Sequence, residues 1–252
     1  MKNIYQDLLF KKSKGIKSFS ILLDPDNSSV EKTINIIQLA VQNNIDYFFV
    51  GGSLLTSDNL NNLISLIKKH CNIPVILFPG SVMQIATSAD GILLLSLISG
   101  RNAEFLIGQH VVAAPILKNS NLEIIATGYI LVDSGNQTTV SYMSNTTPVP
   151  YNKPAIAACT ALAGEMLGLK LIYLDGGSGA FQHIDSRMIE EVRQQCTIPL
   201  IVGGGITNAT DAENSLKAGA DVIVIGNAIE QNPGLISEVA KRLQTLNKSN
   251  IH

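Results

Sequence analysis

The chain has 252 residues and a formal net charge of −2, and 46% of its residues are hydrophobic while only 15% are charged. This composition predicts a large apolar core, and the lack of clustered basic residues argues against a surface that binds nucleic acid. The longest apolar runs are far shorter than the roughly 20 residues that a transmembrane helix needs, which argues against a membrane-spanning segment.

The first 15 residues mix charged and apolar side chains. Within residues 1–15 the apolar residues recur at helical spacing, which predicts a short amphipathic helix rather than a secretory signal. Three cysteines lie far apart in the chain and form no CxxC pair: Cys71, Cys159 and Cys196. We therefore expect a cytoplasmic protein with buried, reduced thiols.

Eight short runs rich in Val, Ile, Leu and Phe follow this segment. Most of them are continuously apolar rather than alternating, which is typical of strands covered on both faces of a parallel sheet. In chain order the runs span residues 18–25, 46–53, 74–80, 91–97, 123–132, 169–177, 199–206 and 221–229.

Segments of helical period separate these runs, and small polar residues mark where their helices begin. The expected caps are Ser28 or Ser29 before Val30, Asn102 before Phe105, Asp185 before Met188, and Asn208 for a helix that stops at Gly219. Repeated strand–helix units in one domain over residues 1–252 predict a single α/β domain, a (β/α)8 TIM barrel, with an open doubly wound sheet as the alternative. The long polar segment at residues 134–153 is expected to be a lid, a binding loop or an interface.

Glycines follow the last two predicted strands, where barrels commonly bind phosphate at the carboxyl ends of the late strands. Gly203, Gly204 and Gly205 follow the seventh strand, and Gly226 and Asn227 follow the eighth. Backbone N–H groups at glycines can approach an anion closely, and a helix that starts there adds positive potential. The alternative is that these glycines only form tight turns.

A carboxylate and further glycines follow the sixth strand, in the motif YLDGGSGA. Asp175 is expected at the strand tip, and Gly176, Gly177, Ser178 and Gly179 supply further donors. A carboxylate beside a phosphate site must accept hydrogen bonds from substrate hydroxyls, so this loop favours a polyol phosphate. The alternative is a flexible loop in which Asp175 caps a helix.

The motif LDPD after the first strand places two carboxylates around a proline. Asp24 could hold a hard cation through oxygen, and Ser53 after the second strand could offer a hydroxyl. The alternative is a turn in which Asp24 and Asp26 cap the helix at Ser28. The histidines have no metal-ligand spacing, and His110 is expected to be a surface or packing residue rather than a catalyst.

The chain resembles the geranylgeranylglyceryl phosphate synthase family, which includes the bacterial heptaprenylglyceryl phosphate synthases. The resemblance extends from Phe19 to Glu230 and includes TPVPYNKPAIAA at residues 147–158. It rests on an ordered set of motifs: LLDPDN, FVGGS, LFPGS, SGRN, IGQH, TGYILV, YLDGGSGA, VGGGI and AGADVIVIGNAIE.

The resemblance implies transfer of a prenyl group from a prenyl diphosphate to the 3-hydroxyl of sn-glycerol 1-phosphate. It implies that Mg²⁺ is bound by Asp24 and Ser53, and that Asp175 and Asp24 are the catalytic residues. It also implies a glycerol phosphate site formed by Tyr173, Leu174, Asp175, Gly176, Gly177, Ser178, Gly179, Gly204, Gly205, Gly226 and Asn227. Asp175 either accepts the hydroxyl proton or only positions the glycerol.

Two departures from the family pattern bear on the substrates. The usual YLEAGSG is YLDGGSG here, so the shorter Asp175 must reach the glycerol hydroxyls. Leu22 stands where the heptaprenyl branch has a lysine, which favours a geranylgeranyl donor. An apolar groove across the barrel top is expected to bind the prenyl chain, with Phe78, Tyr129 and Tyr142 as lining residues.

Other expectations concern partners and rival functions. We expect a homo-oligomer, either a dimer or a hexamer, and transient membrane contact for the lipid product. One rival is another phosphate-binding barrel enzyme, such as a sugar-phosphate isomerase, epimerase or synthase. The other is a barrel that binds a phosphorylated metabolite without catalysis.

Overall fold

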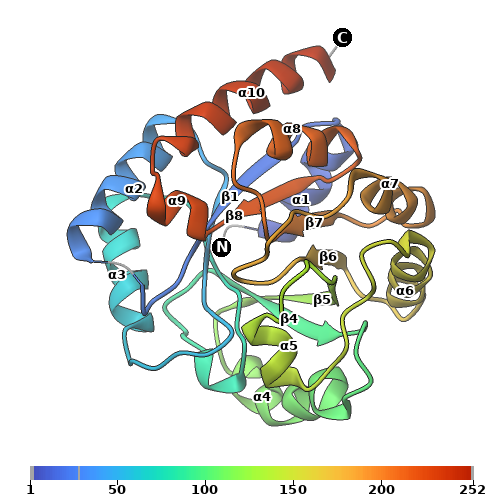
Figure 1. The fold of residues 1–252 in the computed structure, drawn as a ribbon. Helices are drawn as coiled ribbons and strands as arrows, with labels where there is room; N and C mark the ends of the chain where they lie inside the picture. The colour runs from blue at the N-terminus through green and yellow to red at the C-terminus, as the bar shows by residue number, and fades with distance from the viewer. Residues whose placement is uncertain (1–2, 28, 251–252) are drawn as a thin grey trace.

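The computed structural model describes residues 3–27 and 29–250 and shows a closed barrel (Figure 1). All neighbouring strands are parallel, and β1 pairs with β8 to close the ring. The strands are β1 (Ser18–Leu23), β2 (Tyr47–Val50), β3 (Val75–Leu77), β4 (Gly91–Leu97), β5 (Glu123–Leu131), β6 (Leu171–Asp175), β7 (Leu200–Gly203) and β8 (Val222–Ile225). The predicted TIM barrel is therefore confirmed, and the open sheet is excluded.

Helices surround the barrel and connect successive strands (Figure 1). The α-helices are α1 (Ile4–Ser13), α2 (Val30–Gln42), α3 (Leu60–His70), α4 (Gln109–Lys118), α5 (Thr139–Ser144), α6 (Pro154–Met166), α7 (Ser186–Gln195), α8 (Ala209–Lys217), α9 (Asn227–Gln231) and α10 (Leu235–Asn250). A 3-10 turn, η1 (Val82–Gln84), follows β3, and a π-helix, η2 (Glu104–Gly108), precedes α4.

The predicted caps act at most of the expected helix starts. The side chains of Ser29, Asp185 and Asn208 accept hydrogen bonds from the first turns of α2, α7 and α8. Asn102 accepts from the Glu104 backbone N–H just before the π-helix that leads into α4, although the residue at the start of that helix, Ala103, makes no side-chain cap. Ser28 lies outside the described residues.

Each strand buries one set of side chains inside the barrel and the other against the helices. In β2, Tyr47 and Phe49 belong to the inner cluster, whereas Phe48 and Val50 pack in the outer one. Both faces of the strand are therefore apolar, which explains the continuous runs in the sequence. The barrel interior is a packed core rather than a channel.

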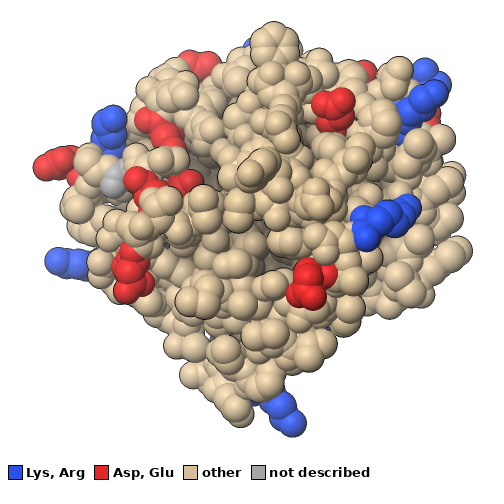
Figure 2. Space-filling view, turned by 60° about the horizontal axis from the view of Figure 1, so that its bottom comes forward, with Lys and Arg blue, Asp and Glu red and all other residues tan. Residues whose placement is uncertain are grey.

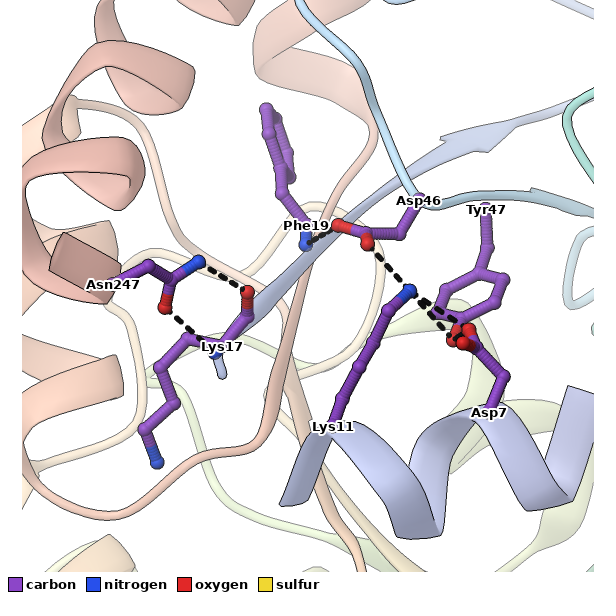
Figure 3. Close-up of polar contacts among 7 residues, drawn as sticks. All are labelled: Asp7, Lys11, Lys17, Phe19, Asp46, Tyr47 and Asn247. Carbon is purple, nitrogen blue, oxygen red and sulfur yellow. Dashed lines mark hydrogen bonds and ion pairs between the residues drawn. The ribbon is translucent and has the colours of Figure 1, made fainter. Parts of the chain in front are cut away.

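Helix α1 closes the amino-terminal end of the barrel and is drawn behind the strands in Figure 1. Its Ile4 and Leu8 are buried in the inner cluster. Lys11 lies 2.7 Å from both Asp7 and Asp46, and the Tyr47 hydroxyl donates to Asp7 (Figure 3). The predicted N-terminal helix is confirmed over residues 4–13, and residues 1–2 lie outside the described part.

The long polar segment at residues 134–153 folds back at the barrel mouth. Val149 bridges Val132 beside β5, and α5 occupies the middle of the segment. A Cβ added to Gly177 would lie 2.8 Å from the Thr138 side chain, so the segment packs directly on the loop after β6. This placement fits the predicted binding loop. In the described part of the chain, no helix is both long and apolar enough to cross a membrane.

Candidate active site at the carboxyl end of the barrel

A polar cleft lies at the carboxyl ends of the strands, where loops after β1, β2, β6, β7 and β8 meet. Most residues that the sequence predicted for the site line this cleft: Asp24, Ser53, Tyr173, Asp175, Gly177, Ser178, Gly179, Gly204, Gly205, Gly226 and Asn227. Two others do not line it. The Leu174 side chain packs in the outer core, because successive strand residues point to opposite faces, and the Gly176 N–H donates to the Gly203 carbonyl.

The loops after β6 and β7 pack closely because glycine lies at their contact. Gly204 and Gly205 have φ values of +79° and +71°, which side chains rarely adopt. A Cβ added to Gly204 would lie 2.5 Å from the Gly176 nitrogen and 2.7 Å from Asp175 Oδ1. The backbone can therefore take this path only with glycine, and both residues line the cleft. Main-chain N–H groups in such turns can bind an anion.

The loop after β8 joins the same wall of the cleft. Helix α9 begins at Asn227 with no side chain capping its first turn. The Asn227 amide lies 3.4 Å from the Ser178 hydroxyl, which connects this loop to the one after β6. The glycine-rich loops after β6, β7 and β8 thus line one cleft, and phosphate binding there stays a prediction.

Asp175 ends β6 and points into the cleft from a buried position. Its Oδ1 accepts from the Gly177 N–H at 2.8 Å, and its Oδ2 accepts from the Tyr129 hydroxyl at 2.6 Å. Burial raises the pKa of Asp175, and these two hydrogen bonds partly offset that rise. The carboxylate keeps lone pairs for a hydroxyl of a bound molecule. Helix α7 is capped by Asp185, so Asp175 is not the helix cap of the alternative interpretation.

Tyr129 holds Asp175 in place, and its hydroxyl stays protonated because burial and the neighbouring carboxylate raise its pKa. We expect Tyr129→Phe to lower kcat/KM about tenfold, since a buried hydrogen bond to a charged group is lost. Removing this donor also raises the pKa of Asp175 further, so the acidic limb of the kcat/KM–pH profile should move to higher pH. Tyr142→Phe, on a tyrosine that is 73% exposed, is the matched control. An unshifted profile in Tyr129→Phe would separate Tyr129 from the function of Asp175.

Asp24 lies at the end of β1, with its carboxylate beside the loop after β2. It accepts from the Asp26 N–H at 3.0 Å and from the Asn27 amide at 3.3 Å. A Cβ added to Gly52 would lie 3.0 Å from Asp24 Oδ2, which places the backbone next to Ser53 against this carboxylate. Burial raises the pKa of Asp24. The carboxylate and hydroxyl oxygens suit a hard cation such as Mg²⁺.

Asp26 has a different function from Asp24. Its exposed carboxylate accepts hydrogen bonds from Thr56 and Ser57, which tie the loop after β1 to the loop after β2 and lower its pKa. Helix α2 is capped by Ser29 rather than by Asp24 or Asp26. Asp24 forms the turn of the alternative interpretation, because it accepts from the Asp26 N–H, but neither carboxylate caps α2, and Asp24 also lines the cleft.

The sequence interpretation missed two polar residues: Gln84, which holds loops beside the cleft together, and Glu230, which lines the cleft. Gln84 is buried, and its amide bonds the backbone of Gly52 and Gly80, which joins the loops after β2 and β3. Glu230 lies on α9, and its Oε1 is 3.3 Å from the Asp24 backbone nitrogen. Its position three residues after Asn227 places both on one helix face, a spacing that could have identified it.

An apolar cavity adjoins the polar cleft and shares Gly52, Ser53, Phe78 and Tyr129 with it. The Phe78 ring stacks on Tyr173 at 4.9 Å between centroids. Further lining residues come from β4, η2, α4 and α5: Leu93, Leu95, Phe105, His110, Ala113, Val140 and Met143.

Two aromatic residues of the predicted groove, Phe78 and Tyr129, line this cavity, and Tyr142 does not. The orientation of α5 turns the Tyr142 side chain outward and Val140 and Met143 inward, so the prediction for Tyr142 was wrong. His110 packs at the cavity wall with its Nε2 3.0 Å from the Ser96 hydroxyl, and burial lowers its pKa. That His110 packs rather than acts as a catalyst stays a prediction.

The comparisons with known proteins agree over nearly the whole chain. The model of the PcrB family matches residues 11–245. Geranylgeranylglyceryl phosphate synthases from Spirosoma linguale and Chitinophaga pinensis are 54% and 51% identical to it; the alignments cover 94% of this chain in both cases, and 96% and 94% of those relatives.

A solved structure has a closely similar backbone fold. The (S)-3-O-geranylgeranylglyceryl phosphate synthase from Thermoplasma acidophilum, in complex with substrate sn-glycerol-1-phosphate, superimposes with a TM-score of 0.90 at 30% identity. The match covers 97% of this chain and 100% of that chain. Since sequence and barrel agree along almost their full length, the chain belongs to the PcrB family.

Proposed function

We propose that the protein transfers a geranylgeranyl group from its diphosphate to the 3-hydroxyl of sn-glycerol 1-phosphate and releases diphosphate. The observation that carries this proposal is the junction of two unlike spaces, a glycine-lined polar cleft and an apolar cavity, at Ser53, Phe78 and Tyr129. The polar cleft suits a polyol phosphate, and the apolar cavity suits a hydrocarbon chain. The names of the relatives support the same reaction.

Charge at the cleft supports a divalent cation as part of this proposal. Asp24, Asp175 and Glu230 line the cleft, and no Lys or Arg does so among the described residues. On the face drawn in Figure 2, the few Lys and Arg are scattered and mostly uncharged residues surround them. Two phosphorylated substrates would meet net negative charge here. Asp24 and Ser53 would hold Mg²⁺, which supplies the positive charge that stabilises the departing diphosphate.

The protein's own groups would then bind the acceptor, orient it and take its proton. The main-chain N–H groups of the loops after β6, β7 and β8 bind the phosphate of the acceptor. Asp175 orients the acceptor hydroxyl and takes its proton, while Tyr129 fixes the carboxylate. As the bond from the allylic carbon to the diphosphate oxygen breaks, that carbon gains cation character. The acceptor oxygen forms the new ether bond, and the apolar walls around Phe78 keep water away.

The finer substrate and assembly assignments are part of the proposal. Leu22 lies beside Gly226 at the cleft, where an added Cβ on Gly226 would be 3.4 Å from Leu22 Cβ. A leucine there, in place of the lysine of the heptaprenyl branch, supports the geranylgeranyl donor. We propose a cytoplasmic homo-oligomer, a dimer or hexamer, with transient membrane contact during product transfer. Exposed apolar side chains on α4, such as Val111 and Val112, support a covered surface.

The acceptor assay tests the proposed function. With the phosphate fixed by backbone donors and the hydroxyls bound by Asp175, the 3-phosphate enantiomer must misplace one group. An unmet buried hydrogen bond costs about 1–3 kcal/mol. We therefore expect kcat/KM for sn-glycerol 1-phosphate to exceed that for the 3-phosphate by about tenfold or more.

The assay should be run over a ladder of prenyl diphosphates, with diphosphate release and the ether product both measured. The geranylgeranyl donor should give the highest kcat/KM. Equal rates with the two enantiomers would contradict the assigned geometry. Binding of glycerol phosphate without turnover of any donor would favour the non-catalytic barrel, and isomerisation of a sugar phosphate would favour the other rival.

A further inference from the structure

We infer that Glu230 is a second functional carboxylate of the cation site, acting through its negative charge beside Asp24. This inference rests on the proposed function, because it concerns the Mg²⁺ that the transfer would use.

The placement of Glu230 is fixed by a short helix after the last strand. Helix α9 starts at Asn227, and Glu230 lies one turn later on the same side, lining the cleft. Its Oε1 accepts a long hydrogen bond, 3.3 Å, from the Asp24 backbone N–H. The strands β1 and β8 pair, so this contact joins the two ends of the barrel sequence at the mouth.

The charge around Glu230 is uncompensated. In the described ranges, neither Glu230 nor Asp24 forms an ion pair with a Lys, Arg or His. Both carboxylates are half-buried at the cleft, and burial together with the charge of Asp24 disfavours the charged form of Glu230. Partly buried carboxylates usually have a positive partner. A divalent cation held at Asp24 and Ser53 would supply that partner.

A bracing function and an electrostatic function predict different behaviour of one variant. Glu230→Gln keeps an oxygen that can accept from the Asp24 N–H but removes the negative charge. If Glu230 only braced the loop after β1, this change would leave cation binding intact. If its charge attracts the cation, the same change weakens cation binding although the loop is unchanged. Glu230→Asp keeps the charge on a shorter side chain.

The chain offers a matched control at the same end of the barrel. Glu31 lies in the first turn of α2, exposed, and outside the residues that line the cleft. Glu31→Gln removes the same charge from the protein, so it accounts for any general effect of net charge. Thermal unfolding of all variants would show that each of them is folded.

The experiment titrates Mn²⁺ into each full-length protein saturated with sn-glycerol 1-phosphate and follows free Mn²⁺ by electron paramagnetic resonance. Changes to groups around a metal's ligands commonly weaken its binding on the order of 10- to 100-fold. We expect Glu230→Gln to raise the Mn²⁺ dissociation constant about tenfold or more. Glu31→Gln should bind like the wild type, and Glu230→Asp should lie between the two.

A parallel assay measures the Mg²⁺ concentration that gives half-maximal prenyl transfer. It should rise in Glu230→Gln by a similar factor, with activity recovered at high Mg²⁺. Wild-type affinity for Mn²⁺ in a folded Glu230→Gln protein would overturn the inference, as would a wild type that binds no Mn²⁺. If the wild type binds Mn²⁺ but transfers no prenyl group, the proposed function fails, and the metal titration still decides the function of Glu230.

Discussion

Asp24→Asn is expected to lower kcat for prenyl transfer by on the order of 10² or more, comparable to the loss of one strong electrostatic contact in a catalytic site. Diphosphate leaves readily only when its growing charge is neutralised, and in the proposed mechanism Asp24, which lines the cleft with Ser53, holds the cation that does this. Asn keeps the oxygen that accepts from the Asp26 N–H, so the loop after β1 should be retained. Affinity for sn-glycerol 1-phosphate should change little, because the proposed phosphate site lies at the loops after the late strands.

Asp26→Asn is the matched control for this prediction. It removes the same charge two residues later, from a carboxylate that only ties Thr56 and Ser57 to its loop. Its kcat should stay within about threefold of the wild type, since exposed contacts of this kind contribute little. Steady-state kinetics would be measured with and without EDTA, and added Mg²⁺ should restore the wild type. Full turnover by Asp24→Asn, or by the wild type in EDTA, would remove the cation from the mechanism.

The barrel could be predicted from the sequence because its strands are buried on both faces. The runs at residues 46–53 and 221–229 contain β2 and β8 together with the loops that follow them. Short local elements were not predictable in the same way. Helix α5 lies in a segment expected to be a loop, and its start at Thr138 packs on Gly177, a contact that only the closed barrel creates.

In the site, too, features fixed by local sequence were predictable, whereas contacts made only in the folded barrel were not. The tight turn after β7 was predictable because Gly204 and Gly205 both have positive φ, a conformation that few residues other than glycine adopt. The bond between Tyr129 and Asp175 depends on the pairing of β5 with β6, 46 positions apart in sequence. The contact of Glu230 with Asp24 spans 206 positions and requires β8 to close on β1. Such partners follow from strand register, which spacing along the chain does not specify.

Gly204→Ala should abolish measurable binding of sn-glycerol 1-phosphate or weaken it by on the order of 10² or more. An alanine at φ +79° costs about 1–2 kcal/mol in backbone conformation alone. Its Cβ would also meet the Gly176 nitrogen at 2.5 Å and Asp175 Oδ1 at 2.7 Å. The loops after β6 and β7 would have to separate, which moves both the main-chain groups proposed to bind the phosphate and the Asp175 carboxylate proposed to bind the hydroxyls. Calorimetric titration of the variant with sn-glycerol 1-phosphate, without a prenyl donor, measures this loss of affinity.

Gly168→Ala is the control that separates the effect on acceptor binding from the cost of placing alanine at a positive φ. Gly168 also has a positive φ, +87°, but an added Cβ there meets nothing within 4 Å, and it precedes β6 at the opposite end of the barrel. Both variants carry the same backbone conformational cost, so both should unfold below the wild type, and Gly204→Ala should unfold at the lower temperature because its Cβ also clashes. Gly168→Ala should nevertheless bind the acceptor normally. A folded Gly204→Ala protein with wild-type affinity would show that the phosphate is held elsewhere, because the contact between these two loops cannot survive the added methyl group unchanged.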